Sequence, residues 1–153
     1  MANPMYGSNK YDGRPGWLDN NEGVFDHGTL AGGLTLTVGV IMDYVASKAD
    51  PAGARAITVP TAALTVAGIK ARSSDGKCKV GDTFQFSFIN VGTAGEDETC
   101  TMTAGTGGTI VGFADVENPV TTHDAFSVGS SLWAVRVTNA TSSSEAIDII
   151  RLA

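Results

Sequence analysis

A glycine-rich run between two apolar stretches is the first place in the sequence where chemistry could occur. Residues 101–116 read TMTAGTGGTIVGFADV and contain four glycines. A phosphate-binding loop has the pattern GxxxxGK[ST] between a strand and a helix, so that helix N–H groups and a lysine meet the phosphates. A dinucleotide fingerprint has GxGxxG at the start of a helix. Here no lysine follows the glycines and residues 109–111 favour a strand, so the run predicts a turn.

The side chains that could do acid–base or metal chemistry do not form a recognisable set. His27 follows Asp26 and Asp124 follows His123, and neighbouring residues on an extended chain point to opposite sides. The sequence has no HxxxH or CxxC spacing for a metal and no GxSxG for a serine nucleophile. We therefore expect no catalytic residue, no metal site and no bound cofactor.

The sequence does not decide whether its two cysteines form a disulfide. Cys78 and Cys100 are too few for a disulfide scaffold, although they would pair if neighbouring strands brought them together. The alternative is two free and partly buried thiols. Either cysteine could act with His123 as a nucleophile, but nothing in the sequence beyond the residue types supports that chemistry.

The charge of the chain limits its partners. The formal net charge is -6 and charged residues make up 17% of the sequence, so a phosphate backbone would repel the chain and we expect no nucleic-acid partner. A local basic cluster at Lys70, Arg72, Lys77 and Lys79 could meet an acidic partner or form a solvated loop with Asp75 as a counter-charge. The N-terminus lacks the apolar segment of a secretory signal, and no run reaches the roughly 18 apolar residues of a membrane span. We expect no membrane partner and synthesis in a cytoplasm.

Apolar periodicity predicts a mainly β domain. Strands are expected at residues 34–41, 81–90, 125–139 and 146–153, where apolar and polar side chains alternate. The strand at 81–90 should be central to the core, because three phenylalanines share one face: Phe84, Phe86 and Phe88. In the strand at 125–139 the inward residues should be Trp133, Val135 and Val137.

Two further elements complete the expected fold. Pro60 and Thr61 precede an apolar stretch and predict a helix that Thr61 caps. The glycines within 101–116 separate two β-prone runs and predict a hairpin. Together these patterns indicate a small antiparallel β-sandwich or barrel-like domain of six to eight short strands over residues 29–153, with one short helix.

Residues 1–28 differ from this domain and predict an extended N-terminal arm. The segment is rich in Asn, Gly, Asp and Pro and shows no helical or strand period. It nevertheless carries more aromatic side chains than a solvated tail needs. Such an arm either docks its rings on another surface or folds back on its own domain. The candidate interface residues are Tyr6, Tyr11, Arg14, Trp17 and Phe25.

The second half of the chain resembles a known family. The segments GDTFQFSFINVG, TMTAGTGGTIVGFADV and SSLWAVRVTNATSSSEAIDIIRLA, preceded by ITVPTAAL, are similar to a recurrent block in structural proteins of tailed bacteriophages. Such blocks occur in capsid decoration (cement) proteins and in other virion surface proteins. The resemblance covers roughly residues 57–153, and the N-terminal arm lies outside it.

The resemblance implies a structural role without catalysis. It implies a protein on the outer surface of a phage head, where it contacts the major capsid protein and stabilises contacts between capsomers. Members of such families often form trimers at three-fold or quasi-three-fold positions, so the resemblance also implies a homotrimer.

Two alternatives remain at the level of the sequence. The first is a tail or fibre-associated protein that binds a host glycan, for which the acidic turn at Glu96 to Glu98 is the visible candidate. The second is a small hydrolase with an unrecognised site. Copy number per virion separates a head protein from a tail protein, and a substrate screen tests the hydrolase.

Overall fold

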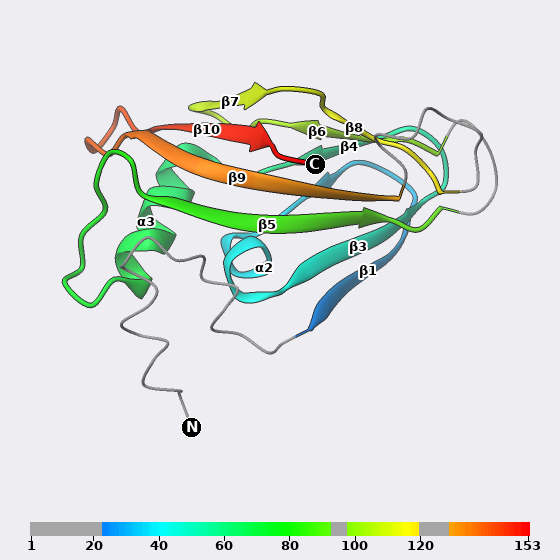
Figure 1. Cartoon of the computed structure of the whole chain (residues 1–153), viewed down its shortest axis with the longest axis horizontal. Coiled ribbons are helices and arrows are strands. Elements are labelled where there is room, and N and C mark those ends of the chain that lie inside the picture. Colours follow the sequence, from blue (N-terminus) through cyan, green and yellow to red (C-terminus); the bar gives the residue numbers. More distant parts are fainter. Residues whose placement is uncertain (1–22, 93–97, 120–128) are drawn as a thin grey trace.

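The computed structural model describes residues 23–92, 98–119 and 129–153, and these residues form ten strands and two helices. This confirms the mainly β class (Figure 1). The expectation of a single helix is wrong, because a second one forms. The helices are α2 (Val38–Asp43) and α3 (Ala62–Arg72). The strands are β1 (Val24–Leu30), β2 (Leu34–Thr35), β3 (Ala46–Pro51), β4 (Arg55–Thr58), β5 (Thr83–Asn90), β6 (Cys100–Thr103), β7 (Gly108–Val111), β8 (Asp115–Val116), β9 (Ser130–Asn139) and β10 (Ala146–Arg151).

The strands form two sheets, and the chain passes from one to the other at almost every step. The six-stranded sheet, here called sheet A, has the order β1-β3-β5-β9-β10-β7, and the four-stranded sheet B has the order β2-β4-β6-β8. Every strand from β2 to β9 therefore lies in the other sheet from the strand before it. The hairpin of β9 and β10 is the exception, because both strands stay in sheet A.

This alternation explains why most of the pairing is parallel. Parallel neighbours need a crossover between them, and here a strand of the opposite sheet supplies it. Within the described residues, β9 runs against its neighbours in sheet A and β8 runs against β6 in sheet B. The expectation of an antiparallel sandwich is therefore wrong for the other pairings.

The strand expected at residues 34–41 is largely replaced by a helix. Only Leu34 and Thr35 pair as β2, and α2 begins at Val38. Thr37 caps this helix, since its hydroxyl accepts the Val40 N–H at 3.3 Å. The residues Val40, Ile41 and Met42 are buried in succession, which a half-buried strand cannot achieve but a short helix inside a core can.

Helix α3 forms as expected and packs closely on α2. Thr61 caps it by accepting the Leu64 N–H. Gly68 allows the close approach, because a Cβ there would lie 2.2 Å from a methyl carbon of Val38. At the end of α3, Arg72 donates from Nε to Asp43 of α2 at 2.8 Å and forms a second contact through its terminal nitrogen. This two-pronged ion pair joins the two helices.

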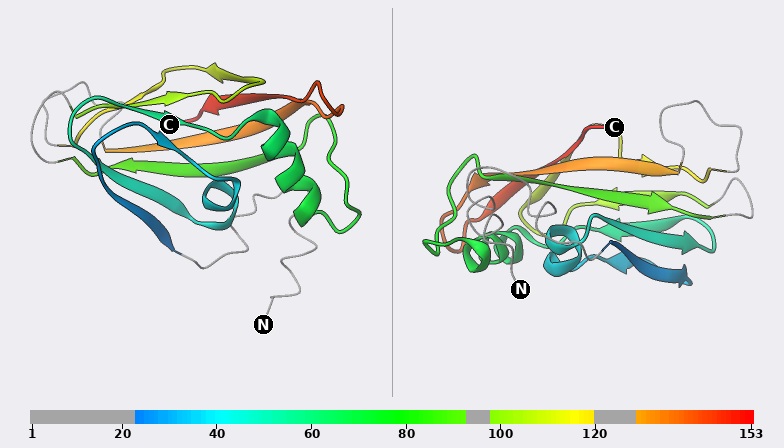
Figure 2. Two further views of the ribbon diagram at one scale, coloured as in Figure 1. Left: turned by 180° about the vertical axis from the view of Figure 1, so that it is seen from behind. Right: turned by 60° about the horizontal axis from the view of Figure 1, so that its bottom comes forward.

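The core lies between the two sheets. Phe84, Phe86 and Phe88 are buried on one face of β5, as expected, and Trp133 stacks on Phe86 with ring centroids 6.5 Å apart. Trp133, Val135 and Val137 are likewise buried on β9, and sheet B contributes Ile57, Met102 and Val116 to the same cluster. Helices α2 and α3 also bury their apolar residues in this cluster, on the side of sheet A where sheet B lies (Figure 2). Among the described residues, the opposite face of sheet A has no second layer.

The glycine-rich run is a turn, but the hairpin predicted around it forms only at its base. Strand β6 pairs with β8 through Cys100 opposite Val116, whereas β7 leaves β6 and pairs with β10 in sheet A. A Cβ at Gly105 would lie 2.6 Å from the Val59 carbonyl oxygen, so the glycine permits contact with the start of α3. The Thr106 carbonyl accepts the first N–H of that helix at 2.9 Å. The chain itself thus occupies the helix end that would bind a phosphate.

Candidate interaction surface

The uncovered face of sheet A carries a contiguous apolar patch. Because alternate residues of a strand point to opposite faces, the strand residues between the buried ones lie on this outer face. Ile150 of β10 stands opposite Ala134 of β9 on one side and Val111 of β7 on the other. Leu152 continues β10, and its N–H donates to the carbonyl of Leu132 at 2.8 Å. We call these five residues the outer patch: Val111, Leu132, Ala134, Ile150 and Leu152.

Exposure in the outer patch increases toward its margin. Ala134 is 6% exposed because its neighbours cover it, whereas Val111 is 42% and Leu152 is 48% exposed. Phe113 follows Val111 at the end of β7 and is 60% exposed. Single exposed apolar residues are normal, but a contiguous group on one uncovered face indicates an interaction surface.

One ion pair borders the outer patch, and a second lies on the same face toward the opposite edge of sheet A. Asp148, which precedes Ile150 by two residues on the same face of β10, pairs with Arg136 of β9. Across the sheet, Lys48 of β3 pairs with Asp26 of β1 at 3.0 Å. Hydrogen bonds to the Gly28 N–H and to Lys48 lower the pKa of Asp26, so this carboxylate stays charged. An apolar centre with a charged margin is the usual arrangement of a protein–protein interface.

Arg151 closes the core next to the outer patch. Its guanidinium lies 5.1 Å from the centre of the Trp133 ring and donates to the Asp115 carbonyl at 2.9 Å. Burial lowers the pKa of Arg151, and the Asp115 charge opposes this effect. The side chain therefore fixes the end of β10 against sheet B, which holds the apolar side chain of Leu152 beside it on the outer face.

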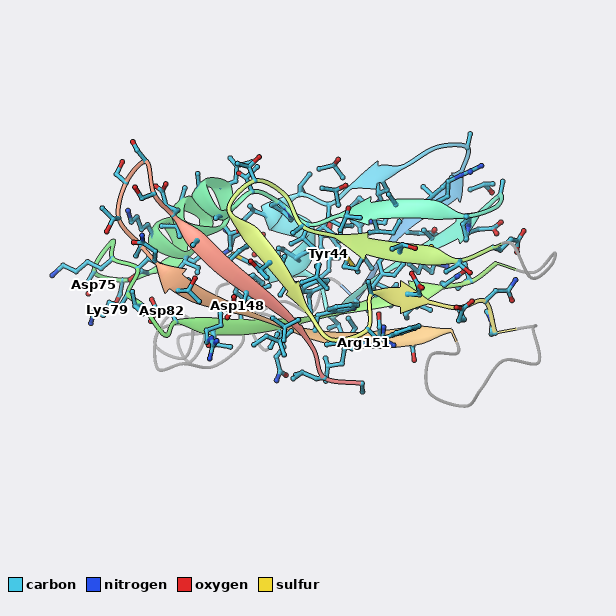
Figure 3. The ribbon with its side chains drawn as sticks, turned by 90° about the horizontal axis from the view of Figure 1, so that it is seen from above. Tyr44, Asp75, Lys79, Asp82, Asp148 and Arg151 are labelled. Atoms are coloured by element: carbon cyan, nitrogen blue, oxygen red, sulfur yellow. The ribbon has the colours of Figure 1, made fainter. Side chains whose placement is uncertain are left out.

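The basic cluster seen in the sequence is divided in the structure. Arg72 is engaged by Asp43, so it does not extend the charge of the neighbouring loop. In that loop, Asp75 accepts the Lys77 N–H at 3.0 Å and Asp82 accepts the Lys79 N–H at 2.8 Å (Figure 3). The Ser73 hydroxyl and the Lys77 N–H lower the pKa of Asp75 by donating to its carboxylate. The loop is thus shaped by its own acids, which favours the interpretation as a solvated loop.

Both thiols are free, and burial keeps them protonated. Cys100 is buried and Cys78 is half-buried. Burial raises the pKa of Cys78 to about 11, with a further contribution from Asp82, and raises that of Cys100 to about 12. At neutral pH neither residue is a thiolate, which is the nucleophilic form.

Thiol reactivity should therefore depend steeply on pH. In the native protein at pH 8 we expect very slow labelling of Cys78 and Cys100 by a disulfide reagent, with rates that rise as the pH approaches 11. The unfolded chain titrates its thiols near about 8.5, so between that pH and 11 the folded state holds more protons than the unfolded state. The free energy of unfolding must then fall as the pH rises above about 8.5. Labelling in guanidinium at pH 8 is the control, and rapid native labelling at that pH would contradict the prediction.

Of the five candidate interface residues, the structure describes Phe25 alone. Phe25 is not an arm residue, because β1 begins at Val24 and the expected boundary at residue 28 falls inside this strand. Its ring packs 5.0 Å from Tyr44 and 4.8 Å from His27, and it lies against the core. Tyr6, Tyr11, Arg14 and Trp17 lie outside the described residues.

Asp26 and His27, the acid–histidine pair among the described residues, do not form a dyad. Asp26 turns to Lys48 on the outer face, whereas His27 packs beside Phe25. Burial lowers the pKa of His27, and Asp26 opposes this shift. His123 and Asp124 lie outside the described residues, as do Glu96 and Asp97 of the acidic turn.

Two further features are absent from the residues that the structure describes. No group of three or more His, Cys, Asp or Glu side chains there is placed to hold a metal ion. None of the helices in these ranges has the length and apolar character required to traverse a bilayer.

Comparison with family models, with curated proteins and with solved structures gives no match to this chain.

Proposed function

We propose that the protein is a decoration protein of a tailed-bacteriophage head, which binds the outer surface of the shell and stabilises contacts between capsomers. Its partners in this proposal are the major capsid protein and further copies of itself in a homotrimer. The resemblance of residues 57–153 to virion structural proteins supports the proposal. The structural observation that carries it is the outer patch with its charged margin, on a face that no described element covers.

The physical mechanism requires binding alone. A protein that binds an assembled shell but not its separated subunits stabilises the shell by the free energy of that binding. Three copies in one trimer multiply a modest contact into strong attachment. The core between the two sheets keeps the outer patch rigid, so little conformational entropy is lost when it docks.

The N-terminal arm would add a second contact in this proposal. Tyr6, Tyr11 and Trp17 are large side chains with polar tips, which makes them suitable anchors, and Arg14 can hydrogen-bond to a carboxylate or carbonyl of the shell. An extended arm of this kind loses entropy on binding but covers a wide surface.

Binding to purified heads that lack this protein tests the proposal. We expect the wild type to bind in hundreds of copies, and the change Leu152→Asp to weaken binding by about tenfold or more, because it places a charge within the apolar surface that docks. Val80→Asp is the matched control, since Val80 is 67% exposed in the loop before β5 and lies outside the outer patch.

Three results would reject the proposal. The first is failure of the wild type to bind heads. The second is undiminished occupancy by a folded Leu152→Asp variant. The third is a copy number of a few per virion, which would favour the tail or fibre role. Native mass spectrometry of the free protein tests the homotrimer separately.

A further inference from the structure

We propose that the outer face of sheet A is a site where two copies of this chain pair face to face, related by a two-fold axis that runs along the strands between β9 and β10. The occupant of the face is a second copy of the same chain, and the pairing forms in the free protein. The register of β9 against β10 carries the proposal, which requires no phage head.

A two-fold axis in this position lays each strand of the hairpin over the other strand of the second copy. β9 of one copy then faces β10 of the other, and the reverse holds on the opposite side of the axis. Because the rotation keeps the position along the strands, each outer residue of β9 faces the copy of its own cross-strand neighbour in β10. Packed sheets keep their strands within about 30° of each other, so the match is closest at these two central strands.

The centre of the face is complementary to itself in size. Ala134 stands opposite Ile150 within the sheet, so the axis places Ala134 under Ile150 of the second copy. Ala134 carries a single methyl group and is 6% exposed, whereas Ile150 is a large side chain. Each isoleucine therefore packs over an alanine. This is the alternation of large and small side chains that close packing requires.

The rows on either side of this centre also match. Arg136 stands opposite Asp148, and the two form an ion pair within the chain. The axis places each of these charges over the opposite charge of the second copy, so two ion pairs become a network of four charges. On the other side, the Leu152 N–H donates to the Leu132 carbonyl at 2.8 Å, which makes the two leucines neighbours. Across the axis, Leu132 of one copy meets Leu152 of the other.

The charge of the face suits a second copy of an acidic chain. The formal net charge of -6 opposes the approach of two copies, except through surfaces whose own charges balance. The outer faces of β5, β7, β9 and β10 carry one positive and one negative side chain, Arg136 and Asp148. The remaining side chains on these outer faces are uncharged. Two copies can therefore meet here without a net repulsion between the surfaces in contact.

The contact is smaller than that of a permanent dimer. Four strands at ~4.8 Å spacing and three rows of side chains at about 6.7 Å cover roughly 19 by 20 Å, or about 400 Å² of each copy. A standard stable interface buries about 800 Å² per partner. We therefore expect weak pairing that increases with concentration and that a larger partner on the same face would displace.

Exchanging the two central side chains tests the pairing in the full-length chain. In sedimentation velocity from about 10 μM to about 1 mM, the wild type should approach twice the mass of its unit, whether that unit is one chain or a trimer. We expect Ala134→Ile and Ile150→Ala each to weaken pairing by about tenfold or more, because the first overpacks the contact and the second leaves a cavity. The double variant Ala134→Ile/Ile150→Ala keeps the wild-type composition. It should restore pairing to within about threefold of the wild type, since large again faces small.

A charge exchange tests the position of the axis. In the Arg136→Glu chain a carboxylate meets a carboxylate across the axis, and in the Asp148→Lys chain a cation meets a cation, so each variant alone should pair weakly. An equimolar mixture of the two should pair strongly, because every charge then meets its opposite. Val80→Asp is the control, since Val80 is exposed outside this face, and it should leave pairing unchanged.

Any of three results overturns the proposal. The first is a wild type that stays at the mass of one unit over the whole concentration range, which assigns the face to a different occupant. The second is a double size variant that is folded by circular dichroism but does not regain the pairing lost in the single variants. The third is a charge mixture that pairs no better than its components, and this result decides the matter if the size variants do not fold. No phage head enters these experiments, so failure of the pairing is distinguishable from failure of the proposed function.

Discussion

Replacing Phe88 by alanine is expected to lower the free energy of unfolding by about 4 kcal/mol. Phe88 is 0% exposed and lies at the centre of sheet A, where β5 pairs with β3 on one side and β9 on the other. The substitution removes the transfer free energy of the ring and leaves a cavity between two sheets that cannot close over it. Urea denaturation followed by circular dichroism measures the loss.

Phe113→Ala is the matched control, because the same atoms are removed from a residue that is 60% exposed. We expect this variant to stay within about 0.5 kcal/mol of the wild type. A comparable loss at both positions would mean that the Phe113 ring is covered in the free protein and contributes to its stability. With stability unchanged, Phe113→Ala also becomes a clean variant for measuring binding to a partner.

Elements with a local cause were predictable from the sequence. In β5 the three phenylalanines alternate with Gln85 and Ser87, so a single strand with one buried face satisfies the pattern. Pro60 and Thr61 predict the start of helix α3, because both favour a helix start without any distant partner. Both predictions are confirmed because the neighbouring residues alone set the conformation.

Elements whose conformation depends on distant partners were not predictable. Leu36, Val38 and Val40 fit a strand pattern. Most of this stretch nevertheless forms α2, because Thr37 caps the helix and its apolar residues pack against β5. Likewise, nothing local in β7 shows that it leaves β6 for β10. The parallel pairing of β3 and β5 depends on a crossover through sheet B, which no short window of sequence contains.

The candidate surface was missed for a related reason, although one signal was present. In the last strand, Ile147 and Ile149 are apolar on the inner face, and Ile150 and Leu152 are apolar on the outer face. A strand that is apolar on both faces, in a hairpin with one face uncovered, indicates a second contact. In the sequence, by contrast, aromatic residues without periodicity favour the N-terminal segment as the interface, through Tyr6, Tyr11 and Trp17.

One buried side chain, Asn90, hydrogen-bonds from the end of β5 to β8 of sheet B. It is 0% exposed at the end of β5, and its amide nitrogen donates to the carbonyls of Glu98 at 2.7 Å and Val116 at 2.9 Å. Its amide oxygen accepts the Gly92 N–H at 2.9 Å. One residue thereby joins sheet A to β8 of sheet B and holds both ends of the 93–97 segment.

Asn90→Ala is therefore expected to lower the free energy of unfolding by about 3 kcal/mol or more, since three buried hydrogen bonds are lost at once. Asn139→Ala is the control, because the Asn139 side chain accepts one hydrogen bond from an exposed Thr141 N–H, and we expect its loss to stay below about 1 kcal/mol. Denaturant titration of the two variants decides the comparison. Equal losses would show that water or rearranged neighbours satisfy the groups around Asn90, and the join between the sheets would then depend on apolar packing alone.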